Sequence, residues 1–139
     1  MATRCAIGIL HNGKIIGKYS HYDGYPEYTG DMLKAHYTDP VRIMGMVMLG
    51  DQSVLMKEYM PTSDDHSFET PDPDVTVFYN RDRGESGCEA RMFDDLNDYF
   101  DHYAEAWCDY YYLWDGFKWC CWNSNRKPVP LDVVIEEVA

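Results

Sequence analysis

The dipeptide Asn12-Gly13 lies between two apolar runs, and it constrains the fold of this chain more than any other feature. Both positions of a two-residue hairpin turn require a positive φ angle, which asparagine and glycine adopt at the lowest cost. The spacing therefore predicts an antiparallel hairpin over residues 4–22. Asp115-Gly116 has the same setting within residues 109–122 and predicts a second hairpin. Two hairpins favour a sheet whose strands pair mainly antiparallel.

Apolar residues at helical spacing predict a long helix over residues 92–107. The side chains that fall at steps of three and four on one face are Phe93, Leu96, Phe100, Tyr103 and Trp107. Two shorter helices are expected over residues 29–37 and 40–50. Gly50 suits the position that follows the last turn of the second one. Alternating β-branched and aromatic residues predict a strand over residues 74–80.

This order of elements predicts a single α+β domain over residues 1–139, a length typical of one domain. We expect a mostly antiparallel sheet of about five or six strands with about three helices packed on one face. A polar, proline-bearing loop is expected at about residues 56–74. A short linker at about residues 123–130 should precede a C-terminal tail, which forms either a last strand or a docked extension.

The chain has a net charge of −12, and this charge is concentrated in residues 64–115. That segment holds 15 of the 24 acidic residues and only three lysines or arginines, so it accounts for the whole excess. Such one-sided charge argues against direct nucleic-acid binding and favours a partner with a basic surface, although acidity also promotes solubility by itself. In the predicted helix, carboxylates about one turn apart form a candidate partner-binding stripe, which consists of Asp94, Asp98, Asp101 and Glu105.

Aromatic residues are concentrated near the second predicted hairpin. Eleven of the 21 aromatic residues lie between Tyr99 and Trp122, more than the core of one hairpin needs. Alternate residues of a strand face opposite sides, so some of these rings are expected at the surface. The candidates for an exposed aromatic patch are Tyr110, Tyr112, Trp114 and Trp119. Tyrosine and tryptophan often anchor protein interfaces, so a binding surface is expected there, with a second copy of the chain as one candidate partner.

Two polar loops each follow a predicted strand, within "SHYDGYPEYTG" (residues 20–30) and "NRDRGE" (residues 80–85). The candidate binding residues around them are Arg4, His21, Asp23, Glu27, Arg81, Arg83 and Glu85. In one interpretation the loops support each other, with Asp23 or Glu27 paired to Arg81 or Arg83. In the other, the loops enclose a ligand pocket lined by His21, whose imidazole could transfer a proton.

Several classes of protein find no support in the sequence. The five cysteines lack the spacing of a zinc site, and the default expectation for them is free thiols. No glycine-rich nucleotide loop, nucleophile motif, secretory signal or membrane-spanning run is present. We therefore expect no metal, no cofactor and no association with a membrane.

Five motifs occur in order: "MATRCAI", "HYDGYPEYTG", "LKAHY", "GDQSVL" and "NRDRGE". Together they resemble a family of small uncharacterised proteins carried by tailed bacteriophages, and the resemblance covers most of the first 100 residues. It implies an accessory protein in the host cytoplasm that binds and inhibits or redirects a host or anti-phage defence factor. The motifs carry no known activity with them, so we expect a non-enzymatic binding protein.

The alternative is a small-ligand-binding protein or an enzyme that uses the loops of His21 and Arg83. The opening of the chain is also similar to that of N-terminal-nucleophile amide hydrolases, in which Arg4 and Asp23 would match supporting residues. The attacking residue would fall at Ala2, which has no nucleophilic atom. This departure argues against that chemistry.

Overall fold

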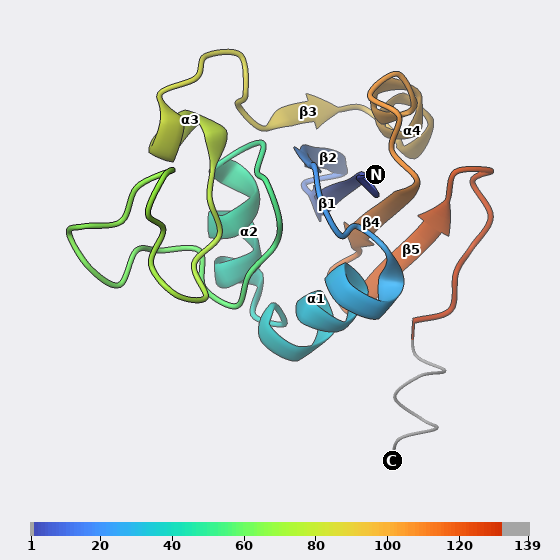
Figure 1. Cartoon of the computed structure of the whole chain (residues 1–139). Coiled ribbons are helices and arrows are strands. Elements are labelled where there is room, and N and C mark those ends of the chain that lie inside the picture. The colour runs from blue at the N-terminus through green and yellow to red at the C-terminus, as the bar shows by residue number, and fades with distance from the viewer. Residues whose placement is uncertain (1, 132–139) are drawn as a thin grey trace.

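A computed structural model describes residues 2–131 of the chain. Within these residues, five strands form one sheet in the order β3-β2-β1-β4-β5 (Figure 1). Neighbouring strands are antiparallel except β1 and β4, which are parallel. The strands are β1 (Cys5–His11), β2 (Lys14–Ser20), β3 (Arg91–Phe93), β4 (Tyr110–Trp114) and β5 (Trp119–Asn123). The predicted α+β class with a mostly antiparallel sheet is confirmed.

The helices are short and lie between the strands in sequence. They are the π-helix η1 (Pro26–Gly30), α1 (Asp31–His36), α2 (Pro40–Met48), α3 (Tyr79–Arg83) and α4 (Leu96–Ala104). No helix in residues 2–131 is long and apolar enough to cross a membrane. The expected C-terminal tail falls mostly on residues 132–139, which lie outside the described part of the chain.

Both predicted hairpins are present. Asn12 and Gly13 have φ angles of 52° and 76°, and His11 pairs with Lys14 across this two-residue turn. In the second hairpin a longer turn joins β4 to β5, and the Asp115 carboxylate accepts hydrogen bonds from two backbone N–H groups within it. Both predicted strand pairs are thus confirmed, but the second turn spans residues 115–118 and is not the predicted two-residue Asp115-Gly116 turn.

The helices do not share one face of the sheet, which corrects the expected arrangement. Helices α1 and α2 contribute Leu33, Ile43 and Met46 to one hydrophobic cluster, whereas α4 contributes Tyr99 and Phe100 to another. Alternation along the strands feeds both clusters, because successive side chains point to opposite faces. In Figure 1, α4 lies on the far side of the sheet from α1 and α2.

Helix α4 is shorter than predicted. The Asp95 side chain caps its first turn by accepting a hydrogen bond from the Asp98 N–H at 2.9 Å. Phe93 lies in β3 instead of the helix. Trp107 follows the helix with a φ of 65° and is 77% exposed, so it does not extend the apolar face.

The strand predicted over residues 74–80 is wrong. Val75 and Phe78 form only isolated bridges, and helix α3 begins at Tyr79. Phe78 bridges to Gln52, which in turn bridges to Ser20 at the end of β2. Val75, Thr76 and Val77 are nevertheless buried, although this segment is not one of the five strands of the sheet.

Candidate functional site

A polar pocket of about 390 Å³ opens where β2 ends. Its walls come from the end of β2, from the segment after α2, and from α3 with the loop that follows it. The lining residues are Tyr19, His21, Tyr22, Asp51, Tyr79, Arg83, Glu85 and Cys88. A volume of this size is sufficient for a small organic ligand.

His21 is fixed at the mouth of this pocket by its neighbours. The Tyr19 hydroxyl lies 2.6 Å from His21 Nδ1, and the Tyr22 ring meets the imidazole edge-on with centroids 4.4 Å apart. The His21 backbone N–H donates to the carbonyl of Ser53 at 3.0 Å. Burial and the positive charge of Arg4 lower the pKa of His21, so its imidazole is neutral at pH 7.

Asp51 joins three segments at the base of the pocket. Its carboxylate accepts a hydrogen bond from the Tyr19 N–H at 3.0 Å, and its own N–H donates to the Cys88 carbonyl at 2.8 Å. Burial raises the pKa of Asp51 to about 6, against the lowering effect of the Tyr19 N–H and of Lys18. A carboxyl group with this pKa is partly protonated near neutral pH and can both donate and accept hydrogen bonds.

Arg83 and Glu85 form the outer wall of the pocket. The Arg83 Nε donates to Glu85 Oε2 at 2.9 Å, and the guanidinium lies 4.5 Å from the centre of the Tyr79 ring. Both side chains of the ion pair are more than 40% exposed, so the pair adds little stability. The opposite charges of Arg83 and Glu85 nevertheless cancel, so the pair adds no net charge to this wall.

The first interpretation of the two polar loops, in which Asp23 or Glu27 pairs with Arg81 or Arg83, is wrong. Arg81 pairs with Asp82, and Arg83 pairs with Glu85. Asp23 has a φ of 55°, and its carbonyl accepts a hydrogen bond from Thr29 Oγ1 at 2.6 Å. Glu27 lies on a separate shallow pocket beside Tyr110. The structure brings His21, Arg83 and Glu85 to one pocket and leaves Asp23, Glu27 and Arg81 outside its lining.

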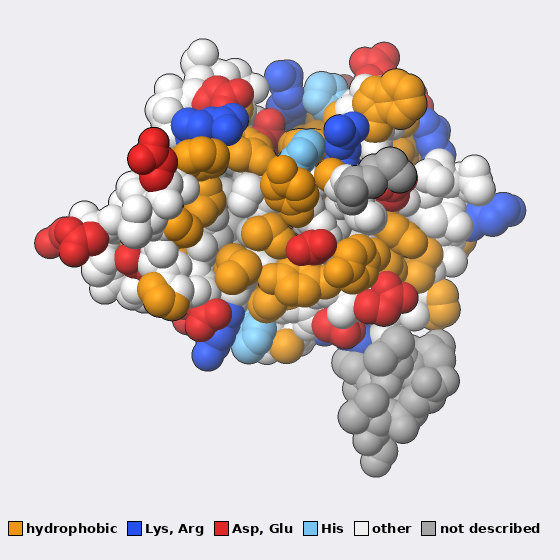
Figure 2. Space-filling view, in the orientation of Figure 1, with side chains coloured by type: hydrophobic (Ala, Val, Ile, Leu, Met, Phe, Trp, Pro, Cys, Tyr) orange, Lys and Arg blue, Asp and Glu red, His pale blue; other side chains and the backbone are white. Residues whose placement is uncertain are grey.

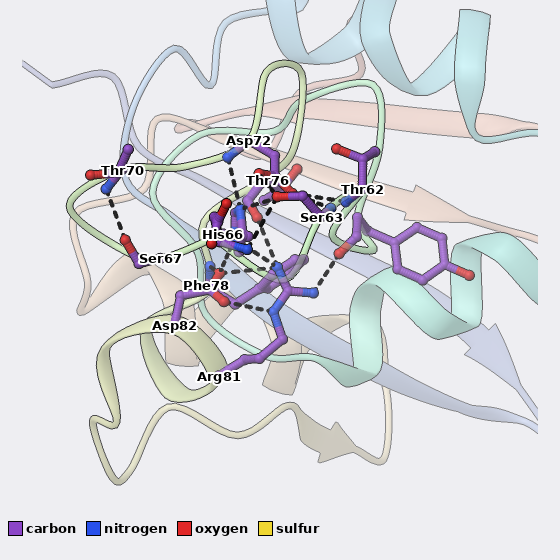
Figure 3. A network of polar contacts seen from close by, with 12 residues as sticks. Thr62, Ser63, His66, Ser67, Thr70, Asp72, Thr76, Phe78, Arg81 and Asp82 are labelled. Atoms are coloured by element: carbon purple, nitrogen blue, oxygen red, sulfur yellow. Dashed lines mark hydrogen bonds and ion pairs between the residues drawn. The ribbon is translucent and has the colours of Figure 1, made fainter.

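Arg81 belongs instead to a buried network that the sequence did not reveal (Figure 3). Its guanidinium contacts the Asp82 carboxylate at 2.8 Å and donates to the Tyr59 and Thr76 carbonyls. His66 Nε2 lies 3.1 Å from Asp82 Oδ2, and its side chain is only 2% exposed. No local motif marks His66, because its partner Asp82 is sixteen positions away in sequence.

This network attaches the loop at residues 56–74 to α3. The Asp72 N–H donates to His66 Nδ1 at 3.0 Å, and the Asp72 carboxylate accepts from two backbone N–H groups and one hydroxyl. Since Nδ1 accepts, Nε2 carries the proton and donates to Asp82. Every nitrogen of the imidazole is therefore occupied, which indicates a structural role for His66.

The predicted acidic stripe is exposed, but half of it is paired. Asp94 contacts Lys14, and Asp101 accepts from Arg126 at 2.6 Å. Asp98 and Glu105 have no ion pair with any residue in 2–131. On the face drawn in Figure 2, carboxylates lie scattered around a hydrophobic centre.

The predicted exposed aromatic patch is wrong for three of its four members. Tyr112, Trp114 and Trp119 are 0%, 7% and 5% exposed, and Tyr110 is partly buried. The Tyr112 hydroxyl donates to the Gly24 carbonyl, and the Trp119 indole N–H donates to the Tyr37 carbonyl. These partners allow the polar ends of large rings to be buried without loss of hydrogen bonds.

A second, mostly apolar groove lies between the β1–β2 hairpin, the start of α2 and the end of β4. Its volume is about 680 Å³. Leu10 and Val41 line it and are 40% and 78% exposed. Clustered exposed apolar side chains are typical of surfaces that contact other molecules.

Residues 2–131 contain no group of three or more histidine, cysteine or acidic side chains placed to hold a metal ion. No disulfide joins any of the cysteines within residues 2–131. Burial raises the pKa of Cys121 to about 12 and raises that of Cys5 further, so these thiols stay protonated.

The chain matches no protein-family model, no curated protein and no solved structure. The resemblance to tailed-bacteriophage proteins therefore stays a prediction.

Proposed function

We propose that this chain is a non-enzymatic accessory protein that binds a basic surface on another protein and thereby inhibits or redirects it. The resemblance to tailed-bacteriophage proteins supplies the setting, in which the target is a host or defence factor in the cytoplasm of the infected cell. The observation that carries the proposal is the concentration of exposed carboxylates in residues 64–115. Twelve of the 15 acidic residues there are exposed.

The outer face of α4 is the part of this surface best suited to a partner. Asp98, in α4, and Glu105, which directly follows its last residue, are exposed there and have no ion pair within residues 2–131. On its inner face the helix is held by Tyr99 and Phe100, which are 0% and 4% exposed. A rigid helix presents its charges in a fixed arrangement, which lowers the entropy cost of binding.

The test is a charge reversal that leaves existing contacts intact. Asp98→Lys with Glu105→Lys changes the two unpaired carboxylates of α4 and preserves the Asp101–Arg126 pair. Asp64→Lys with Asp65→Lys is the matched control, because it makes the same charge change in an exposed loop. The partner is first captured from a bacterial host lysate, identified by mass spectrometry and purified.

Binding kinetics are then measured at low and high salt. The α4 variant should slow association about tenfold at low salt, since exposed charges act mainly on encounter. The control should change the rate much less, and high salt should remove the difference because it screens exposed charges. Equal rates for the two variants would contradict a role for α4, and the apolar groove at Val41 would be the next surface to alter.

A further inference from the structure

Arg4 carries the one buried side-chain nitrogen or oxygen in residues 2–131 that has no hydrogen-bond partner, namely its Nε. Its guanidinium also forms no ion pair with these residues. Four other arginines each contact a carboxylate, namely Arg42, Arg81, Arg83 and Arg126. A buried, unsatisfied donor is uncommon and calls for an acceptor that residues 2–131 do not supply.

The position of Arg4 places this donor beside the polar pocket. Cys5 pairs with Ser20, so Arg4 precedes β1 where His21 follows the paired strand β2. The Thr3 carbonyl accepts a hydrogen bond from the Gly24 N–H at 2.8 Å, which keeps this stretch of chain close to the loop. The charge of Arg4 acts on both Tyr19 and His21, two residues of the pocket wall.

The pocket wall contains one arginine, and that one is already paired. Arg83 is matched by Glu85, whereas the Asp51 carboxylate accepts the neutral Tyr19 N–H. Arg4 is therefore the arginine beside this pocket that has no carboxylate partner among residues 2–131. The rings of Tyr22 and Tyr79 line the pocket as well and offer apolar surface.

We infer that Arg4 and His21 hold the carboxylate or phosphate group of a small organic anion, whose remaining atoms occupy the pocket against Tyr22 and Tyr79. A guanidinium presents paired donors that match both kinds of oxyanion. The neutral imidazole adds one more N–H donor on the same side. This ligand site is independent of the acidic surface of α4, so either can fail in experiment without the other.

The first experiment maps binding with three defined probes. Inorganic phosphate, acetate and phenyl phosphate are titrated separately into protein with isotope-labelled histidine, with sodium chloride at matched ionic strength as the blank. A saturable shift of the His21 resonances is expected, together with a rise in the pKa of His21, because the bound anion offsets the charge of Arg4. Phenyl phosphate should bind more tightly than inorganic phosphate, because its ring reaches the pocket.

The second experiment assigns the anion contact. Arg4→Met should weaken phenyl phosphate binding about tenfold or more, since a charge-assisted hydrogen bond is lost. Arg4→Lys should keep part of the affinity, because it keeps the charge without the paired donors. Arg126→Met is the matched control and should bind as the unaltered protein does. The Arg4 side chain makes no hydrogen bond or ion pair with residues 2–131, so thermal unfolding should show that both Arg4 variants remain folded.

Two results would overturn the inference. One is the absence of a saturable His21 shift with all three probes. The other is equal affinity of the folded Arg4→Met and Arg126→Met variants. A preference for phosphate over acetate, or the reverse, would support the inference and would decide which oxyanion the site takes.

Discussion

The sheet is buried on both faces, but the side chains that cover the two faces differ in kind. Under α4 the cover is aromatic, with the Tyr99 ring packed among Phe93, Tyr103 and Tyr111 at centroid distances of 5.5 to 6.3 Å. Under α2 the cover includes a fully buried lysine, Lys18, which donates to the Met46 carbonyl at 2.8 Å and to Gln52.

The segments that cover the two faces of the sheet also differ in secondary structure. Helix α4 is short and regular, and Gly8 and Gly17, which pair in adjacent strands, make room for the Tyr99 ring. The opposite face is completed by residues 49–90, which are mostly irregular and are held by side-chain-to-backbone hydrogen bonds. The aromatic face should therefore respond to changes in volume, and the polar face should respond to lost hydrogen bonds and to pH.

The largest effect is expected at Tyr99. Tyr99→Ala should lower the free energy of unfolding by about 3–5 kcal/mol, the usual cost of removing a buried aromatic ring. Gly17→Ala should also destabilise, since an added Cβ would lie 2.6 Å from the Tyr99 ring. Urea denaturation measures both. Tyr99→Phe is the control, which retains the ring and removes only the hydroxyl bond to the Tyr112 carbonyl. A small loss for Tyr99→Ala would show that this face is loosely packed.

The second effect is expected at His66. His66→Ala should lower the free energy of unfolding by about 2 kcal/mol, because it leaves the Asp72 N–H unpaired and removes one of the donors to the Asp82 carboxylate. His11→Ala, at an exposed turn, should change it by less than about 0.5 kcal/mol. Chemical denaturation of both variants compares them directly. Equal stability would mean that the network does not hold the loop to α3.

The third effect is a dependence on pH that belongs to the polar face alone. Burial lowers the pKa of Lys18 well below its usual value. In the pH range between the folded and the unfolded pKa of Lys18, the unfolded chain binds more protons at this position than the folded protein does, and stability rises with pH. One proton corresponds to a slope of at most about 1.4 kcal/mol per pH unit, and we expect a positive slope between pH 7 and 8.

Lys18→Met should remove this slope, whereas Lys14→Met, at an exposed position, should keep it. Denaturation curves recorded at pH 7 and pH 8 give the slope of each variant. The pKa values of His21 and His102 are also lowered. These two groups therefore change protonation below pH 7 and do not contribute to the slope measured between pH 7 and 8. An unaltered slope in Lys18→Met would show that Lys18 remains protonated in the folded protein.

The smallest effect is expected at Trp107, which follows α4. Trp107 has a φ of 65° in the turn after α4 and is 77% exposed. Trp107→Gly should raise stability by about 1 kcal/mol, because glycine adopts this conformation without steric cost. Trp107→Ala, which keeps the strained backbone, should stay close to the unaltered protein in thermal unfolding. A loss of stability in both variants would indicate that the indole packs on α4 in solution.

The sequence by itself determined the features that depend on neighbouring residues. Asn12-Gly13 specified the first hairpin, because few other dipeptides adopt two successive positive φ angles. Residues 96–104 specified a helix through the spacing of Phe100 and Tyr103, and the α+β class followed from the order of such segments. His21, Arg83 and Glu85 could be named as candidate site residues because each belongs to a short polar segment after a predicted strand, although Arg83 lies in α3 in the structure.

Only the tertiary structure decided which face each element covers and which distant groups meet. Periodicity shows that α4 has an apolar side, but the sheet face that it covers depends on the crossover that leaves β1 and β4 parallel. The burial of Trp119 depends on a carbonyl 82 residues away in sequence. Lys18 and His66 look like ordinary surface residues in the sequence, because side-chain type does not encode long-range partners. Their environments arise from packing between distant segments, which hydrophobic pattern and turn chemistry do not specify.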